Sequence, residues 1–295
     1  MPFCRHAVFE RRAEASRVGG AIMDLGVVTR SFPESTNLET AELLKTNGFR
    51  WTELCFSQTD SRYWAYNGRS DLSDMTNERS RSIVDVYRAH GIDIPALGVF
   101  TNLIEPDDAE LEKNLLYFQR MIEIAAHNGI PYVSTECGFI PGQRGINADL
   151  YEERFQRLVD SMSWLVKRAD ENGVSIALEP CVLDVVPSAK RTADFIKQVG
   201  SDRLKVLLDP ANLIANSSET DMFFYLADHV AYFHGKDRKV NDRMGRVVGD
   251  GDIDWVAFLK LYHKHNDGAP FIFEYVNMDN FLEIRDRVLN ADAAT

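Results

Sequence analysis

The stretch VSIALEPCVLDVVPSAKRTADFIKQVGSDRLKVLLD (174–209) in the second half of the chain decides the fold. Its two short apolar runs, 174–179 and 204–209, have the length and composition of buried strands. Between them, 188–199 has the apolar spacing of a helix and ends at Gly200, a residue suited to the positive φ of a helix end. A strand, a helix and a second strand in this order predict a βαβ unit with parallel strands.

The same alternation of strand and helix continues on both sides of this stretch, from Met23 almost to the end of the chain. The expected strands are 23–28, 50–56, 92–99, 131–136, 174–179, 204–209, 230–236 and 270–275. The expected helices lie near 37–47, 76–90, 107–128, 149–172, 188–199, 219–227, 254–265 and 279–290. Eight such units predict an α/β protein built as a single (β/α)8 TIM barrel.

An open, doubly wound sheet is the alternative arrangement of the same units. Such sheets usually carry a glycine-rich phosphate loop directly after the first strand. Here that position reads TRSFPEST (29–36), which has neither a GxGxxG nor a Walker pattern. The closed barrel is therefore favoured over the open sheet.

The chain of 295 residues is expected to form one catalytic domain, residues 23–295, after an N-terminal extension, residues 1–22. The extension is rich in arginine but lacks the apolar stretch of a secretory signal. A short ordered helix packed on the barrel is an equally open interpretation of it. Met23 is an alternative start of the protein.

The bulk composition limits the classes of partner. A net charge of −12 repels phosphate backbones and anionic lipid, so it argues against nucleic acid and favours neutral sugars or metal-bound substrates. The four cysteines form no CxxC pair, which is typical of reduced thiols in a cytoplasmic protein. No apolar run approaches the ~20 residues that span a bilayer, so no membrane association is expected.

Ionisable side chains stand at the C-terminal ends of six predicted strands, where α/β barrels place their active sites. These residues are Glu53, Glu136, Glu179, Asp209, His234 and Glu274. The last four end consecutive strands, the fifth to the eighth. Because a buried carboxylate is costly unless it is paired or bound to a metal, this succession indicates one shared cation.

Three carboxylates and one imidazole suggest which divalent metal the site would hold. Oxygen-rich ligand sets favour Mn²⁺ or Mg²⁺, while Co²⁺ and Zn²⁺ are also compatible with this set. A divalent ion would leave the four side chains with a net charge near −1. Its open coordination positions would then accept two neighbouring oxygens of a substrate.

Four short motifs resemble a known family, the xylose isomerase-like TIM barrel superfamily, and particularly its sugar phosphate isomerase/epimerase branch. The motifs are ALEP (177–180), LLDPAN (207–212), FHGKD (233–237) and IFEY (272–275). The segment HGKDRKVNDRMGRVVGDGDIDW (234–255), in which His-x-Lys-Asp precedes a Gly-Asp-Gly-Asp-Ile-Asp-Trp run, is similar to the same branch. The resemblance extends from about Met23 to Leu289.

The resemblance implies that Glu179, Asp209, His234 and Glu274 bind the metal. In ketose 3-epimerases of this superfamily, the glutamates of strands five and eight also act as the acid/base pair, which here would be Glu179 and Glu274. The implied reaction is proton abstraction next to a carbonyl through a metal-stabilised enediolate. The expected enzyme is accordingly a metal-dependent sugar isomerase or epimerase.

One position departs from many members of the family. They carry a histidine three residues after the strand-six aspartate, whereas this chain has Asn212, which cannot carry a proton at neutral pH. The departure keeps a second enzyme class open: a lyase acting by β-elimination on a keto-sugar, keto-inositol or 3-keto-glycoside, as in inosose dehydratase-like relatives. An endonuclease IV-like activity is disfavoured, because it needs many histidines and a basic face. A non-catalytic scaffold is the remaining alternative.

Several residues near the predicted mouth are candidates for substrate contacts: Asn212, Lys236, Glu136, Glu53 and Trp64. For Lys236 a salt bridge with Asp237 is an open alternative, and for Glu53 and Glu136 a buried ion pair is. Trp64 lies in the long segment 57–75 after strand two, whose aromatic side chains suit either a sugar ring or a subunit interface. The second use leaves a homo-oligomer open.

Overall fold

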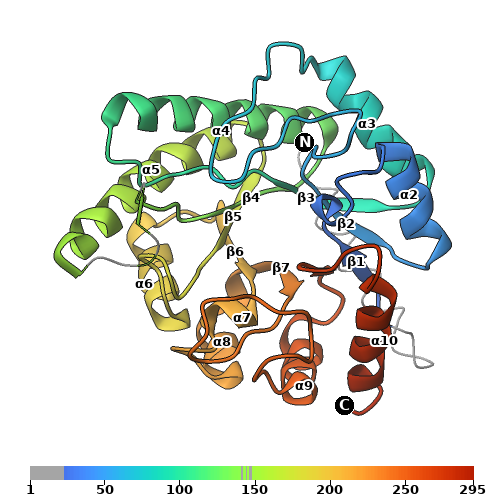
Figure 1. The fold of residues 1–295 in the computed structure, drawn as a ribbon. Helices are drawn as coiled ribbons and strands as arrows, with labels where there is room; N and C mark the ends of the chain where they lie inside the picture. The colour runs from blue at the N-terminus through green and yellow to red at the C-terminus, as the bar shows by residue number, and fades with distance from the viewer. Residues whose placement is uncertain (1–22, 141, 144, 146–147) are drawn as a thin grey trace, which may run out of the picture.

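The computed structural model describes residues 23–295 except 141, 144, 146 and 147, and shows one closed barrel of eight parallel strands (Figure 1). The strands neighbour each other in chain order, and β1 (Leu25–Val27) closes the barrel by pairing with β8 (Phe271–Phe273). The helices lie around the outside of the strands (Figure 1). This arrangement confirms the predicted (β/α)8 barrel.

The other strands are β2 Trp51–Leu54, β3 Asp93–Gly98, β4 Tyr132–Glu136, β5 Ser175–Glu179, β6 Leu204–Leu208 and β7 Val230–Gly235. The α-helices are α2 Asn37–Thr46, α3 Asn77–Ala89, α4 Asp108–Asn128, α5 Tyr151–Glu171, α6 Ala189–Val199, α7 Pro210–Leu213, α8 Glu219–Leu226, α9 Trp255–Asn266 and α10 Phe281–Asp292. Short 3₁₀ turns are η2 Thr29–Ser31, η3 Ala148–Leu150 and η4 Ala227–His229. None of the helices in the described part of the chain combines the length and apolar character that crossing a membrane requires.

The predicted helix ends at glycine are confirmed, and the cause is backbone conformation. Gly129 after α4 and Gly200 after α6 both adopt left-handed φ values, 64° and 65°. An L-residue with a Cβ rarely adopts this conformation, so glycine stops the helix at little cost. At the other end of α6, the Ser188 hydroxyl accepts a hydrogen bond from the Arg191 amide and caps the first turn.

The strands are shorter than predicted, because the chain leaves the sheet ladder as it reaches the barrel mouth. Strand β8 ends at Phe273, one residue before Glu274, and β6 ends at Leu208, one residue before Asp209. The sequence analysis also missed α7, whose first residue is Pro210 and whose N-cap is Asp209. Asp209 and Glu274 thus lie on the turns that follow β6 and β8, at the mouth of the barrel.

Packed side chains fill the barrel interior. Large rings from Trp51 and Tyr232 share this space with small residues, among them Ala96 and Ala177. Gly26 belongs to the same pattern, since a Cβ at this position would overlap the backbone carbonyl of Trp51. The interior is a solid core, so polar side chains at the mouth rest on an apolar floor.

The long connection between β7 and α9 is organised around the carboxylate of Asp237. Asp237 forms an isolated bridge with Arg246, and its Oδ2 accepts hydrogen bonds from Gly249 N at 3.0 Å and Trp255 Nε1 at 2.8 Å. A Cβ at Gly251 would overlap Asp237 Oδ1, so this glycine makes room for the carboxylate. The Gly-Asp-Gly-Asp-Ile-Asp-Trp run therefore has a structural role of wrapping around Asp237.

Candidate metal centre

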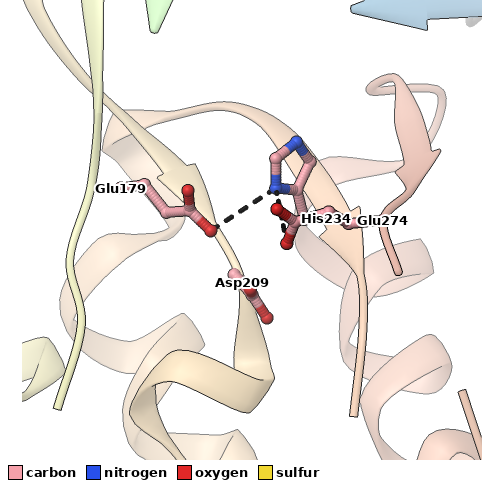
Figure 2. A group of neighbouring side chains, drawn as sticks. All are labelled: Glu179, Asp209, His234 and Glu274. Carbon is pink, nitrogen blue, oxygen red and sulfur yellow. Dashed lines mark ion pairs between the residues drawn. The ribbon is translucent and has the colours of Figure 1, made fainter. Parts of the chain in front are cut away.

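Four buried side chains from consecutive strand ends converge on one point at the barrel mouth (Figure 2). Glu179 ends β5, Asp209 follows β6, His234 lies in β7 and Glu274 follows β8. One potential ligand atom from each of the four lies within 4.8 Å of the others. The structure thus brings together the four residues that the sequence analysis selected as metal ligands.

The hydrogen bonds of these residues test whether a cation fits the site. Glu179 Oε2 and His234 Nδ1 are both buried, and neither makes a hydrogen bond, although Nδ1 lies 3.4 Å from Glu179 Oε1 and 3.7 Å from Glu274 Oε2 (Figure 2). Leaving buried polar atoms unsatisfied costs roughly 1–3 kcal/mol each, whereas a metal ion would satisfy both. Three carboxylates and one imidazole nitrogen are also a donor set that divalent metals accept, so the residues fit a metal ion.

His234 is oriented by two residues behind it. Its Nε2 lies 2.9 Å from Glu53 Oε2, and the Tyr232 hydroxyl donates to the same carboxylate oxygen. The ring therefore presents Nδ1 to the cluster, which is how a carboxylate commonly orients a metal-binding histidine. Gly98 allows this arrangement, because a Cβ there would overlap Glu53 Oε1.

Glu53 was a candidate for substrate contact, and the structure places it beneath His234 with 0% exposure. This position favours a role in orienting His234 over a direct contact with substrate. Burial alone would lower the pKa of His234, but the carboxylates of Glu53 and Glu179 outweigh it and raise that pKa well above its usual range. Without a metal, the ring is accordingly held protonated between the two glutamates.

Two cations stand among the carboxylates. Lys236 Nζ lies 2.6 Å from Asp209 Oδ2, 2.7 Å from Glu274 Oε2 and 3.8 Å from Glu179 Oε1. The Arg30 guanidinium, which follows β1, forms an ion pair with Glu274 Oε1. Lys236 thus pairs with the cluster, and Asp237, its alternative partner, bonds within the β7–α9 connection.

The sequence predicted a net charge near −1 for the four ligands with a divalent ion. In the structure three more charged residues, Glu53, Arg30 and Lys236, contribute to the charge of the site. Glu53, Glu179, Asp209 and Glu274 supply four negative charges, and Arg30 and Lys236 supply two positive ones. With a neutral histidine the total is two negative charges, which one divalent cation would cancel. A neutral metal-loaded site suits an uncharged substrate.

The crowded carboxylates respond differently to these cations. Burial opposes ionisation of Glu274, yet the nearby Lys236 and Arg30 lower its pKa far below the usual range. Burial and the neighbouring Glu179 and Glu274 carboxylates raise the pKa of Asp209 to about 7, against the opposing effect of Lys236. Asp209 is therefore more readily protonated than Glu274 when no metal is bound.

Asn212, the position that departs from the family pattern, is 1% exposed and bridges two polar side chains. Its Nδ2 donates to Glu179 Oε1 at 2.9 Å, and its Oδ1 accepts from Arg238 Nη2 at 3.2 Å. Arg238 is held by the backbone carbonyl oxygens of Ala211 and Arg243. This chain of contacts orients one oxygen of Glu179 and leaves Oε2 uncommitted.

The segment after β2 reaches over the mouth toward β4. Tyr66 donates its hydroxyl hydrogen to Glu136 Oε2 at 2.8 Å, and Trp64 stands 6.2 Å from the Tyr66 ring. Glu136 is the register partner of Glu179 in the β4–β5 ladder, so it borders the cluster. Trp64 lies 5.7 Å from the Arg30 guanidinium, which pairs with Glu274, so both Glu136 and Trp64 neighbour the cluster or its partners.

The chain is similar to known proteins of one family. The family model described as "Xylose isomerase-like TIM barrel" matches residues 41–294. The chain belongs to this family. Its relatives include the L-ribulose-5-phosphate 3-epimerase UlaE of Escherichia coli O139:H28, 21% identical over 256 residues that cover 85% of this chain and 86% of the relative.

Solved structures of the xylose isomerase-like fold superpose over most of the chain. A structure of the IolI protein with a bound zinc atom has a TM-score of 0.69 at 20% identity, covering 92% of this chain and 96% of that one. The 3-keto-D-glucoside 4-epimerase YcjR of Escherichia coli has a TM-score of 0.70 at 12% identity, covering 92% and 98%. At these identities the structures establish the fold.

Two residues at the site of this xylose isomerase-like barrel, Arg30 and Tyr232, were not predicted from the sequence. Arg30 lies in TRSFPEST (29–36), the segment that follows β1. Its position just after a strand end is the signal that could have identified it. Its guanidinium stands 4.7 Å from the Phe100 ring centroid and 5.7 Å from that of Trp64. Tyr232 gave no signal, because an aromatic residue inside a strand normally belongs to the core.

Proposed function

We propose that this protein is a divalent-metal-dependent sugar isomerase or epimerase that moves a proton on the carbon next to a carbonyl. The observation that carries the proposal is the convergence of Glu179 and Glu274 on the same cluster from β5 and β8 (Figure 2). The metal, held by Glu179, Asp209, His234 and Glu274, would polarise the substrate carbonyl and favour the enediolate. Mn²⁺ or Mg²⁺ is the favoured ion, with Co²⁺ or Zn²⁺ as alternatives.

Glu179 and Glu274 are the proposed acid/base pair. Glu179 Oε1 is held by Asn212, and the Glu179 oxygen that the metal leaves uncoordinated would carry the transferred proton. Glu274 is bonded to Lys236 and Arg30, which stabilise its ionised form. A substrate carbon between the two carboxylates would lose its proton to one and regain a proton from the other on the opposite face.

Arg30 and Lys236 give the site two permanent donors next to the reacting atoms. Both side chains already bind Glu274, and Arg30 also has a buried Nε–H without a hydrogen-bond partner. As negative charge develops on the enediolate, donors fixed in this way stabilise it without reorganisation. Their proposed roles are to stabilise that charge and to hold Glu274 in place.

β-Elimination on a keto-sugar, keto-inositol or 3-keto-glycoside is the second candidate, and Asn212 favours it. The Asn212 side chain is hydrogen-bonded to Glu179 and Arg238 and cannot carry a proton. The proton carrier that a histidine would provide at this position is therefore missing. Elimination begins with the same proton abstraction. It differs only in that a leaving group departs from the next carbon.

The proton transfer is tested by incubating metal-loaded protein in D₂O with free ketoses and, separately, with 3-keto-glycosides. We expect deuterium at the carbon next to the carbonyl together with an epimer, and loss of at least about 10²-fold in rate for Glu274→Gln. Glu112→Gln, an exposed glutamate on α4, is the matched control and should exchange like the wild type. Release of water or aglycone without epimer would replace epimerisation by elimination, and unchanged exchange in Glu274→Gln would refute its proton-transfer role.

A further inference from the structure

We propose that a cavity beside the metal cluster binds a second, uncharged sugar ring, so that the substrate is a glycosidically linked keto-sugar. The inference rests on the proposed function, because it assumes that the reacting ring lies on the cluster. The cavity has a volume of about 450 Å³ and lies under the segments that follow β2, β4 and β5. This volume falls within the roughly 300–1,000 Å³ typical of small-molecule sites.

The cavity adjoins the cluster but does not include it. Among the described residues that line it are Glu136 and Cys181, and none of the four cluster residues does. Glu136 pairs in register with Glu179, and Cys181 follows Glu179 by two residues. The space is therefore additional to the room that a reacting ring needs on the cluster, and it begins about one strand spacing away.

The walls of the cavity are held in place by hydrogen bonds within the protein. The Tyr151 hydroxyl donates to the Val185 carbonyl oxygen at 2.8 Å, which ties α5 to the segment after β5. The Phe139 amide donates to Asn102 Oδ1 at 3.0 Å, which ties the segment after β4 to that after β3. Because these walls are already fixed, ligand binding between them costs the protein little conformational entropy.

The lining combines apolar surface with few polar groups, as small-molecule sites do. Ile104, Leu183 and Val185 supply aliphatic surface, and Tyr66 and Phe139 supply aromatic rings. Phe139 is 36% exposed and Tyr66 45% exposed, so both rings are open to a ligand. A pyranose offers a matching apolar C–H face and a rim of hydroxyl groups.

Arg154 of α5 indicates a polar partner inside the cavity. It lines the space, is only 9% exposed, and its Nε is buried without a hydrogen-bond partner. Its ion pair is a long one, 3.5 Å to the exposed Glu153. A buried guanidinium with free donors calls for an acceptor, which the hydroxyl or ring oxygens of a sugar would supply.

The charges of the lining disfavour a phosphate in the same place. Glu136 and Asp184 line the cavity together with Arg154, so its described lining includes two carboxylates and one guanidinium. A phosphate would add about two negative charges to it, at a cost in repulsion. A neutral ring avoids this cost, which separates the second-ring interpretation from a phosphosugar site.

The test compares one-ring and two-ring ligands on the full, metal-loaded protein, by calorimetry or ligand-observed NMR. The probes are methyl α- and β-glucosides, the α- and β-linked glucose disaccharides, and glucose 6-phosphate. We expect at least one disaccharide to bind about tenfold or more tightly than its one-ring counterpart, equivalent to about 1.4 kcal/mol. Equal affinity of one and two rings, or tighter binding of the phosphate, would overturn the proposal.

Filling the cavity provides the matched comparison. Leu183→Trp should abolish the advantage of the second ring, while Leu38→Trp, at a 49% exposed leucine on α2, should retain it. If Leu183→Trp does not fold, Arg154→Met takes its place, with Arg168→Met on the same helix as control. Persistence of the disaccharide advantage in the cavity variant would also overturn the proposal. Because this readout measures binding and not proton transfer, it is separate from the D₂O exchange that tests the proposed function.

Discussion

Arg30 shows how a single side chain can connect the substrate pocket to the proposed acid/base pair. Its guanidinium lies against the ring of Phe100 and pairs with Glu274. Aromatic contact and burial restrict its position, so its donors are already oriented when a substrate binds. We therefore expect its proposed role to be separable from metal binding, for which Glu179, Asp209, His234 and Glu274 are the proposed ligands.

We predict that Arg30→Met lowers kcat by about 10²-fold while the bound metal stays at the wild-type amount, since one preorganised donor is lost. Steady-state kinetics and metal analysis of the same preparation measure the two effects. Arg50→Met is the control, because Arg50 stands 4.8 Å from the Trp51 ring yet pairs with the exposed Asp24 and Asp93. Loss of metal together with activity would show that Arg30 supports the cluster instead.

The protonation of the metal-free cluster predicts a pH dependence of metal binding. The pKa of Asp209 is raised to about 7 and that of His234 is raised as well, so both must lose protons before they bind a cation. Metal affinity should therefore fall as pH drops through the raised pKa of His234, and also below about 7 as Asp209 is protonated, by roughly tenfold per pH unit for each proton released. Calorimetric titration in buffers of different ionisation enthalpy counts the protons, and a pH-independent affinity would contradict this description.

At the scale of elements, the residues at the strand ends were the part of the site that the sequence could predict. The order of strands and the residues at their ends follow from local periodicity, so Glu179, Asp209, His234 and Glu274 could be selected before the structure was known. The contacts between elements could not. Glu53 and His234 are 181 residues apart, and no local pattern indicates that one orients the other.

The β7–α9 connection illustrates a motif whose structural reason emerged only from the fold. Gly251→Ala would place a Cβ against Asp237 Oδ1 and force the carboxylate away from Gly249 and Trp255. We predict a loss of about 1–3 kcal/mol in unfolding free energy, as overpacking usually costs. Thermal denaturation should show a drop of roughly 2–4 °C per kcal/mol. Gly68→Ala, where a Cβ meets ordinary contacts only, is the control, and equal melting temperatures would contradict the packing argument.

At the scale of the whole molecule, the barrel concentrates charge at one end. The chain carries a net charge of −12, yet the site balances four carboxylates with two cations and a place for one divalent ion. We propose that this metal-loaded mouth, rather than the global charge, selects the substrate. That residues 23–295 act as one catalytic domain stays a prediction, as does the N-terminal extension 1–22, which lies outside the described residues. Assembly into a homo-oligomer also stays a prediction.

The central claim is that Glu179, Asp209, His234 and Glu274 hold one divalent metal, and metal analysis of stripped and reloaded protein tests it most directly. We predict one equivalent per chain in the wild type and in Glu136→Gln, whose carboxylate borders the cluster without belonging to it. Asp209→Asn and His234→Gln should each retain well under one equivalent while remaining folded by circular dichroism. A wild-type protein that binds no divalent metal, or full occupancy in both ligand variants, would contradict the claim.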